Sequence, residues 1–395
     1  MGGHIGRRYL AASAARYRLW TVEQFAREVR GMTARTVPAS ALTTFGARYR
    51  VTETSRHVRL SVPGHLDPQD RSALRQRDVS SVPEQFTLEL PQATLQGREG
   101  WVFHRGHLVE DIWQEEGFSA RSLRPLWRQE STVRLPGTTV SLLQPWLPNY
   151  YHWTVQVVPR IVRILDLLAE RGEEADRWLI PSGAPGYIRQ WLDLLGIPEE
   201  RRLGVETRGQ VFDVERLLVA SVPGRNRWVP PSTVEQVRAA VAHVPPGAGG
   251  RRLLLQREGE RRRVLLNAPE VVDALTRRGF EVVDPGGMTV AEEASLFSGA
   301  DLVVGVHGAG LTNLVFCRPG ATVVELTPRG LLYPTFVKLA AAAEVGHHMV
   351  VGTEPRLPWP LRFPDVDADL VVDVPELSAV VDRVLRGSTH GISSP

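Results

Sequence analysis

The chain has 395 residues, of which 43% are hydrophobic and 23% charged, with a formal net charge of +3. This length exceeds one ordinary hydrophobic core and favours two domains, and the composition is typical of a soluble globular protein. The basic residues, all arginine except Lys338, are scattered among almost as many acidic ones, so we expect no nucleic-acid partner. The single cysteine, Cys317, excludes an internal disulfide framework.

The sequence predicts no targeting or transmembrane segment. Residues 1–20 lack the apolar core of a signal peptide. The longest uncharged apolar run, residues 302–317, is too short and too rich in glycine to span a bilayer. Together with the lone cysteine, which fits a reducing compartment, this pattern indicates a cytoplasmic protein.

Residues 1–135 are expected to form a β-rich N-terminal extension of the domain that follows, at residues 136–243. Within the extension, residues 85–110 alternate like a small antiparallel meander. Residues 136–243 then alternate strands with helices, which predicts a first Rossmann-like domain. The expected strands are residues 139–144, 177–182 and 215–220, and the expected helices are residues 150–171 and 187–195.

A proline- and glycine-rich segment at residues 244–252 is typical of a linker. Residues 253–375 predict a second Rossmann-like domain with a doubly wound parallel sheet, and residues 376–395 a C-terminal helix and tail. Two such domains predict a ligand site in the cleft between their sheets. The expected strands are residues 252–256, 280–284, 301–306, 322–326 and 348–352, and the expected helices are residues 269–278, 289–300, 308–316 and 334–344.

The segment VVGVHGAGLTN (residues 303–313) follows a buried strand and begins a helix. Gly308 and Gly310 leave backbone N–H groups open at the helix N-terminus, which favours an anion such as a diphosphate. His307 can add a hydrogen bond or, when protonated, a charge. The glycines can equally serve only a tight strand-to-helix turn, so both interpretations stay open.

Charged residues also follow two strands of this domain at the edge where α/β proteins bind ligands. Arg257 and Arg263, in LLLQREGERRR (residues 253–263), could clamp phosphate oxygens, although a solvated basic loop is the alternative. Glu325, at the end of the expected strand 322–326, could accept hydrogen bonds from ribose hydroxyls or could be an ordinary surface carboxylate.

The segment DVDAD (residues 365–369) resembles the aspartate pair that holds a divalent metal in metal-dependent sugar transferases. So short a motif often matches by chance, and we favour an acidic turn. The histidines of HRGH (residues 104–107) and His347–His348 lack further ligands at metal spacing. No metal is therefore expected.

The segment PNYYHWTVQVVPR (residues 148–160) places a histidine at the front of a helix. Asn149 is the expected N-cap, so His152 lies in the first turn, where the helix dipole favours a neutral imidazole that can accept a proton. Gln156 lies one turn further, within reach of His152. The alternative is a histidine packed among aromatic side chains. Trp153 and Val157 are expected in the core, and Pro159 predicts a kink.

Three segments occur in a characteristic order: NYYHWTVQVVPRI (residues 149–161), LLLQREGERRRVLLN (residues 253–267) and FSGADLVVGVHGAGLTNLVFCRPGATVVEL (residues 297–326). Together they resemble glycosyltransferase family 61 over roughly residues 135–344, and the third segment is the most specific. The resemblance implies a GT-B architecture, in which two Rossmann-like domains face each other across a cleft. It also implies an inverting, metal-independent transfer from a nucleotide sugar, usually a UDP-sugar, to a hydroxyl of a glycan or small molecule.

The resemblance gives each candidate residue a role. The catalytic base would be His152. The donor diphosphate would be bound by Arg257, Arg263, His307, Gly308, Ala309 and Gly310, and the nucleoside by Asn313 and Glu325. The acceptor side would include Asn149, Tyr150, Tyr151 and Gln156. The family uses xylose, arabinose and N-acetylglucosamine, so it does not fix the sugar.

The chain departs from the family pattern at three places. Gln156 stands where members usually carry glutamate, and its amide can orient His152 but cannot act as a base. Gln256 replaces a common serine, and Asn267-Ala268 replaces Asn-Glu. Two other functions therefore stay open: a nucleotide-sugar epimerase on the same fold, and a non-catalytic protein that binds nucleotide sugars or glycans.

Overall fold

The structure, a computed structural model, forms two compact units. Unit 1 comprises Met1–Arg56 and Pro83–Asn226, and unit 2 comprises His57–Val82 and Arg227–Pro395. The residues that the structure describes are 35–58, 66, 68–75, 81–109, 111–112, 130, 132–144, 147–224, 228–256, 262–355 and 367–388.

Unit 1 is built on a nine-stranded mixed sheet. Its strands follow the order β1-β7-β6-β5-β11-β8-β9-β10, and β2 also pairs with β5. The part β10-β9-β8-β11 is parallel, whereas β5 pairs antiparallel with β11 and β6. The strands are β1 (Arg35–Val37), β2 (Arg48–Glu53), β5 (Gln85–Gln96), β6 (Trp101–His104), β7 (His107–Val109), β8 (Thr132–Ser141), β9 (Arg177–Pro181), β10 (Arg202–Val205) and β11 (Val211–Ala220).

The predicted meander is confirmed by the antiparallel pairing of β5 with β6 and of β6 with β7. It continues the sheet of the strand–helix part of unit 1, because β5 pairs with β11 along almost its whole length. Alternate residues of β5 point into one apolar core with residues of β11, among them Leu88, Leu90, Leu95, Phe212 and Leu217. The meander and the strand–helix part therefore share one sheet and one core.

Three helical segments connect β8 to β9 in unit 1 as one continuous helical run. They are α5 (Tyr150–His152), a π-helical turn η3 (Trp153–Val157) and α6 (Val158–Arg171), which ends at Gly172 in the left-handed conformation. A further helix, α7 (Gly186–Leu194), connects β9 to β10. The predicted helix at residues 150–171 is confirmed, with a π-helical turn just before Pro159.

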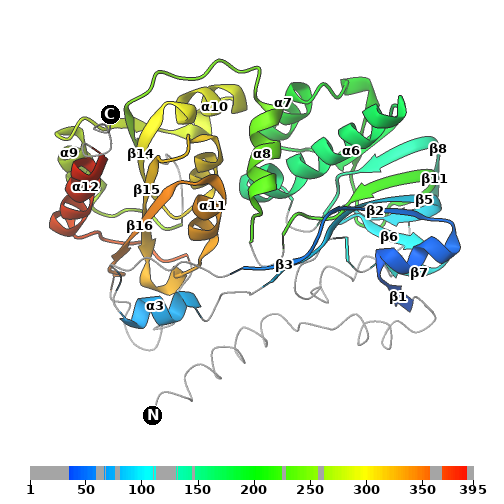
Figure 1. The fold of residues 1–395 in the computed structure, drawn as a ribbon, viewed down its shortest axis with the longest axis horizontal. Coiled ribbons are helices and arrows are strands. Elements are labelled where there is room, and N and C mark those ends of the chain that lie inside the picture. Colours follow the sequence, from blue (N-terminus) through cyan, green and yellow to red (C-terminus); the bar gives the residue numbers. More distant parts are fainter. Residues whose placement is uncertain are drawn as a thin grey trace, which may run out of the picture. The chain divides into compact units, whose positions relative to one another are not determined.

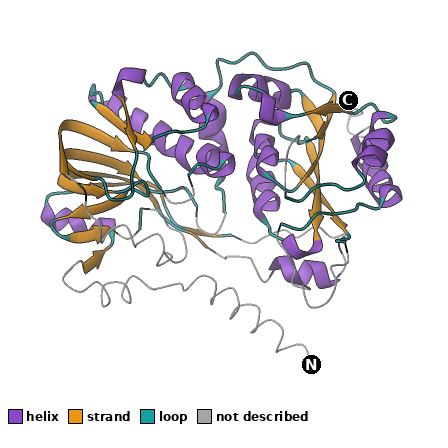
Figure 2. Cartoon of the chain, turned by 180° about the vertical axis from the view of Figure 1, so that it is seen from behind, coloured by secondary structure: helices purple, strands orange, loops and turns teal. Residues whose placement is uncertain are grey.

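Unit 2 contains a five-stranded sheet in the order β13-β12-β14-β15-β16, parallel at every pairing. Figure 1 shows α9 and α12 (Val374–Ser388) on one side of β14, β15 and β16, and α10 and α11 on the other. The alternating strands and helices coloured in Figure 2 give the same α/β arrangement from behind. The strands are β12 (Arg251–Leu255), β13 (Glu281–Val283), β14 (Ala300–Val306), β15 (Thr322–Pro328) and β16 (Gly346–Gly352).

The helices of unit 2 lie close to their predicted positions. α9 (Ala268–Thr276), α10 (Val290–Ser298) and α11 (Thr335–Ala343) follow β12, β13 and β15, and a 3₁₀ helix η6 (Ala309–Phe316) follows β14. α10 begins with a capping box in which Thr289 and Glu292 bond each other's backbone N–H. Two helices were not among the predicted strand–helix pairs: α8 (Pro231–Ala240) and, before it in the chain, α3 (Pro68–Arg75).

α3 explains why His57–Val82 belong to unit 2 although the predicted extension covered residues 1–135. Leu66 and Leu74 are buried against Leu332, Val337 and Met349. Asp70 of α3, also buried, accepts a hydrogen bond from Arg329 Nη1 at 2.6 Å. Apolar burial and one ion pair thus fix this early segment to the second sheet.

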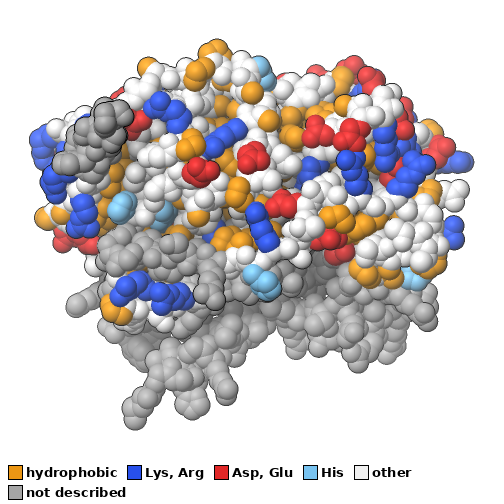
Figure 3. Space-filling view, viewed as in Figure 1, with side chains coloured by type: hydrophobic (Ala, Val, Ile, Leu, Met, Phe, Trp, Pro, Cys, Tyr) orange, Lys and Arg blue, Asp and Glu red, His pale blue; other side chains and the backbone are white. Residues whose placement is uncertain are grey.

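Charges of both signs are mixed on the surface face shown in Figure 3, as the scattered arginines of the sequence led us to expect. Among the residues that the structure describes, no helix is long and apolar enough to cross a membrane.

Candidate functional site

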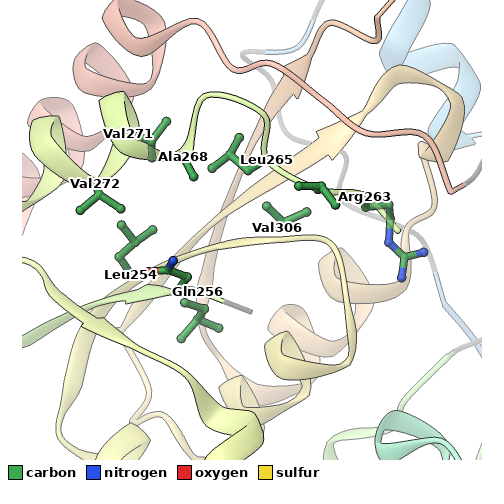
Figure 4. A pocket seen from close by; sticks show the side chains of 10 residues that line it. Leu254, Gln256, Arg263, Leu265, Ala268, Val271, Val272 and Val306 are labelled. Atoms are coloured by element: carbon green, nitrogen blue, oxygen red, sulfur yellow. The ribbon is translucent and has the colours of Figure 1, made fainter. Parts of the chain in front are cut away.

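A pocket lies at the carboxyl edge of the sheet of unit 2, where the strand order reverses between β12 and β14. It has a volume of about 180 Å³ and is lined mainly by apolar side chains of β12, β14 and α9, with Gln256 and Arg263 as its polar members (Figure 4). In open α/β sheets, ligands bind outside the carboxyl ends of the strands at this reversal point. The pocket therefore stands where such a fold places a ligand.

The glycine turn follows β14 at the same edge of the sheet. Gly308 has an extended backbone (φ 174°), and η6 begins at Ala309. A side chain added at Gly310 would meet only Pro285 Cγ, at 3.9 Å, so internal packing does not require a glycine there. A glycine needed only for a tight turn would show crowding or a left-handed φ, and Gly310 shows neither. The structure thus favours an open backbone over a merely tight turn at this position.

His307 bonds Glu325 of β15, which in turn bonds His347 of β16. Its Nδ1 bonds Glu325 Oε1, and the other carboxylate oxygen, Oε2, bonds His347 Nε2 at 2.7 Å. Strand register explains the grouping, because Glu325 pairs with Gly305 of β14 and with Met349 of β16, which places all three side chains on one face. The His307 ring also meets the Phe336 ring of α11 edge-on, with centroids 4.9 Å apart.

Glu325 is completely buried, at 0% exposed, and both of its oxygens are bonded to imidazoles. Burial by itself would raise the pKa of this carboxyl group, but its interactions with the imidazole of His307 and, less strongly, with that of His347 lower it to about 2. The expectation that Glu325 contacts a ribose does not fit this geometry. Its carboxylate is enclosed and already engaged.

Asn313 is likewise buried, and its Nδ2 donates to Glu293 Oε1 of α10 at 2.8 Å. The side chain joins η6 to α10 across the interior of unit 2. The predicted contact with a nucleoside therefore does not fit Asn313 either.

Arg263 lies at the rim of the pocket and is connected to the acidic turn. Its backbone N–H bonds Asp367 O at 3.1 Å, and its Nη1 bonds Asp367 Oδ1 at 3.4 Å. Asp369 accepts a hydrogen bond from the Val264 N–H at 2.7 Å. The two described aspartates of DVDAD thus anchor the basic loop, in line with the acidic-turn interpretation. Arg257 lies outside the described residues.

The second candidate group lies in unit 1, at the helix that follows β8. Asn149 is the N-cap, as predicted, since its Oδ1 accepts hydrogen bonds from the N–H groups of Tyr151 and His152 at 3.0 and 3.4 Å. Trp153 and Val157 are fully buried, as predicted. In the π-helical turn the Val158 N–H bonds Trp153 O, five residues back. Turns of this kind are frequent at functional sites.

His152 heads a chain of hydrogen bonds that leads into the interior. Its Nδ1 bonds Gln156 Oε1 at 2.8 Å, and the same oxygen accepts from Gln144 Nε2 at 2.9 Å. Gln144 Oε1 in turn accepts from Arg160 Nη1 at 3.1 Å. The guanidinium of Arg160 also donates to the carbonyls of Ser141 and Ala220, the last residues of β8 and β11. This network therefore lies at the carboxyl edge of the sheet, where the order of its parallel strands reverses.

The direction of these bonds follows from Arg160. A guanidinium only donates, so Gln144 must accept with its oxygen and donate with its nitrogen, and Gln156 must present its oxygen. His152 then carries its proton on Nδ1, and a neutral imidazole keeps its lone pair on Nε2. Burial lowers the pKa of Arg160 to about 10, which leaves it charged at neutral pH. The geometry suits a histidine that accepts a proton at Nε2.

The two predicted acceptor-side tyrosines differ in exposure. Tyr151 is buried, and its ring meets the His152 ring edge-on at 5.5 Å, so it packs in the interior rather than facing a ligand. Tyr150 is half-buried and lies edge-on to Tyr187 at 5.2 Å. Only Tyr150 keeps the exposure that stacking on an acceptor would need.

The described cysteine and histidines do not form a nucleophile or a metal site. Burial raises the pKa of the Cys317 thiol to about 12, which makes it inert as a nucleophile. Glu325 bonds both His307 and His347, so these side chains are engaged with each other rather than arranged around a metal position. Within the described residues, no group of three or more histidine, cysteine or acidic side chains is arranged to hold a metal ion.

Sequence reasoning missed His347, Gln144 and Arg160. In the sequence, His347 has no further ligands at metal spacing. In the structure it lies diagonally across from Glu325 on the same face of the neighbouring strand, and the two side chains are bonded. The register between β15 and β16 brings them together, and this register cannot be deduced from the sequence. Gln144 and Arg160 have no motif, and only the tertiary structure brings them to His152.

Comparison with known proteins finds a similarity to glycosyltransferases. Residues 150–324 match the family model described as Glycosyltransferase 61, a range that contains both the His152 helix and the glycine turn. This part of the chain, somewhat less than half of it, is therefore similar to glycosyltransferase family 61.

Similar proteins of known name come from Oryza sativa subsp. japonica. A β-1,2-xylosyltransferase is 32% identical over 191 residues, which is 48% of this chain and 31% of that protein. An α-1,3-arabinosyltransferase is 39% identical over 20% of this chain and 14% of its own length. A second β-1,2-xylosyltransferase is 40% identical over 20% of this chain and 17% of its own length. The matches thus span at most about a third of these curated relatives.

Proposed function

We propose that this chain is an inverting, metal-independent glycosyltransferase that moves a sugar from a nucleotide sugar, expected to be a UDP-sugar, to a hydroxyl acceptor. The observation that carries the proposal is the position of two polar groups within the part of the chain that is similar to family 61. The His152 network and the glycine turn each lie at the carboxyl ends of parallel strands, where the strand order reverses. The proposal includes a GT-B arrangement of the two units and a cytoplasmic location.

Unit 2 would bind the donor. The backbone N–H groups of Ala309 and Gly310, at the start of η6, and the imidazole of His307 would face the diphosphate. The apolar pocket beside Gln256 and Arg263 would hold the planar base, because a base needs apolar walls and a few polar groups at its edge. These groups would stabilise the charge that develops on the departing diphosphate, where preorganised electrostatics contributes most.

Unit 1 would present the acceptor. His152 Nε2 would take the proton of the attacking hydroxyl, with its ring orientation set by Gln156 and, through Gln144, by Arg160. The hydroxyl oxygen would form a bond to the anomeric carbon as the bond to the diphosphate oxygen breaks on the opposite face of the sugar. The relatives are named as xylosyl- and arabinosyltransferases, so we propose a pentose as the first sugar to test.

The test begins with binding and proceeds to turnover. UDP, GDP and ADP are compared by thermal shift, since a ligand at about 100 times its Kd adds about 2.7 kcal/mol of stability. UDP-xylose, UDP-arabinose and UDP-N-acetylglucosamine are then incubated with the protein and a panel of hydroxyl acceptors, and UDP release and glycoside formation are measured with and without EDTA.

We expect UDP to stabilise the protein and one pentose donor to be consumed with inversion in the presence of EDTA. Activity that disappears with EDTA and returns with Mn²⁺ would contradict the metal-independent mechanism. Conversion of the donor sugar without acceptor would point to an epimerase. UDP binding with no turnover across the panel would point to a non-catalytic binding protein, the outcome that Gln156 makes worth testing.

A further inference from the structure

The group formed by His307, Glu325 and His347 contains a charge that the interior has to balance. Glu325 is fully buried, and an ionised carboxylate in that position is very costly unless a cation pairs with it. Its two hydrogen-bond partners are both imidazoles. The ammonium of Lys338 on α11 lies over the Trp228 ring at 4.7 Å, and His348 points to the opposite face of β16.

The surroundings of the two histidines decide which one carries the balancing charge. The Nδ1 of His347 is buried and has no hydrogen-bond partner among the described residues. An imidazolium at His347 would leave a buried N–H donor unsatisfied there, whereas a neutral ring that donates from Nε2 leaves only a lone pair. His347 is therefore suited to be neutral. The charge then falls to His307.

His307 is placed to use that charge. Its Nδ1–H is directed to Glu325, so the second N–H of an imidazolium is Nε2–H, on the other edge of the ring. The His307 side chain keeps 10% of its surface exposed and directly precedes the glycine turn, whereas the carboxylate behind it is fully enclosed. The ring thus places a positive charge at the start of η6, on the side away from the buried carboxylate.

From this geometry we infer that His307 is a fixed imidazolium whose Nε2–H binds an oxygen of the donor diphosphate, with Glu325 and His347 as the residues that hold its charge and orientation. The inference rests on the proposed function for the nature of the anion. It replaces the ribose contact expected for Glu325 with a positioning role. It also gives the neutral His347 a role, because its hydrogen bond keeps the second carboxylate oxygen satisfied.

The test compares the affinities of UDP and uridine, whose ratio reports the contribution of the diphosphate. We expect wild-type protein to prefer UDP strongly and Glu325→Gln to reduce that preference by about 10- to 100-fold, because a neutral amide cannot balance an imidazolium. Glu293→Gln is the matched control, since it neutralises another buried carboxylate of unit 2 and should leave the ratio unchanged.

A second measurement needs no substitution in the group. ¹⁵N-histidine NMR of wild-type protein near neutral pH reads the protonation of each ring, and the His307 signals are assigned through contacts with the Phe336 ring. We expect both nitrogens of His307 to carry protons and His347 to be neutral. This result keeps the inference testable if Glu325→Gln fails to fold.

The outcomes separate the inference from the proposed function. If wild-type protein prefers UDP but Glu325→Gln keeps the preference, or if His307 is neutral, the inference is wrong and the nucleotide site stands. If UDP does not bind but inorganic pyrophosphate shifts the His307 Nε2 signal, the nucleotide assignment is wrong and the anion site stands. If neither molecule affects His307, both are wrong.

Discussion

Gln156 orients His152 without adding negative charge. Its oxygen receives the Nδ1–H of His152 and an N–H of Gln144, so the imidazole is fixed in one tautomer and one plane. An imidazolium formed during transfer would gain no ion pair from this amide, whereas it would from a carboxylate. The chain thus retains the orientation of a histidine base but not its electrostatic support.

Replacing His152 by alanine should slow transfer without loosening the donor. We expect kcat to fall by about 10²- to 10⁴-fold, because a positioned general base contributes about that much. UDP affinity should stay unchanged, since the donor groups belong to unit 2. Steady-state kinetics with the best pentose donor and calorimetry with UDP provide the two readings. His107→Ala, in β7 of the same unit, is the control and should retain wild-type turnover. Near-wild-type turnover of His152→Ala would exclude the base.

Gly310 offers a test of the open backbone at the glycine turn. Gly310→Ala has room within the protein, because the added Cβ would meet only Pro285 Cγ at 3.9 Å, and stability should change little. If a diphosphate lies against this backbone, the same methyl group should weaken UDP binding by at least about tenfold, or about 1.4 kcal/mol. Gly287→Ala adds a methyl group where nothing lies within 4 Å and should bind UDP normally. Equal UDP affinity in both variants would place the diphosphate elsewhere.

At the scale of elements, the local sequence predicted most of the helices and strands of unit 2. Buried strands read as continuous apolar runs, and Thr289 with Glu292 marks the start of α10. The predicted ends of these helices and strands lie within a few residues of the observed ends, because capping residues and glycines are local sequence signals. The helix after β14 was predicted but its 3₁₀ pitch was not, nor was the π-helical turn at Trp153–Val157, since small changes of helical pitch depend on packing.

The residues of the site were harder to predict than the elements that carry them. Glu325, His307 and His347 lie in recognisable segments, but their hydrogen bonds depend on the register of three strands. The sequence alone does not distinguish a carboxylate that binds a ribose from one that bonds two histidines. Burial distinguishes them, and burial is a property of the tertiary structure.

α3 supplies a prediction at this same scale. Leu74→Ala should destabilise the protein by about 2–5 kcal/mol, because Leu74 is fully buried against Leu332 and Val337 and its removal leaves a cavity. Urea unfolding at equilibrium measures the loss. Gln69→Ala, on the exposed side of α3, should change the unfolding free energy by less than about 0.5 kcal/mol. Similar unfolding curves for both variants would mean that α3 adds nothing to unit 2.

At the scale of the whole molecule, the two units repeat one principle of construction. Each has parallel strands whose order reverses, and each holds a buried charge among or beside those strands: Arg160, which donates to the last residues of β8 and β11 in unit 1, and Glu325 within β15 of unit 2. The charges are of opposite sign, and each holds a histidine, directly or through amides. Donor and acceptor chemistry are therefore proposed on separate sheets that use the same kind of position.

The buried carboxylate also predicts how stability depends on pH. The pKa of Glu325 is lowered from 4.5 to about 2 on folding, so the folded state binds fewer protons in this range. A lowered pKa adds stability above the unfolded value that is lost as pH falls toward the folded one, here between 4.5 and about 2. Wild-type protein should therefore lose its advantage over Glu325→Gln in this interval. Urea midpoints from about pH 7 to about pH 3 measure it, and a constant difference would contradict the ionised group.

The path of the chain has a consequence for biosynthesis. α3 is translated long before Leu332, Val337 and Met349, its partners in unit 2. The strands and helices of unit 1 can assemble while α3, already outside the ribosome, still lacks the surface that covers Leu74. Completion of unit 2 therefore has to wait for the last part of the chain and then recruit a segment made early. A fragment beginning at Arg227 would expose the apolar surface that α3 normally covers.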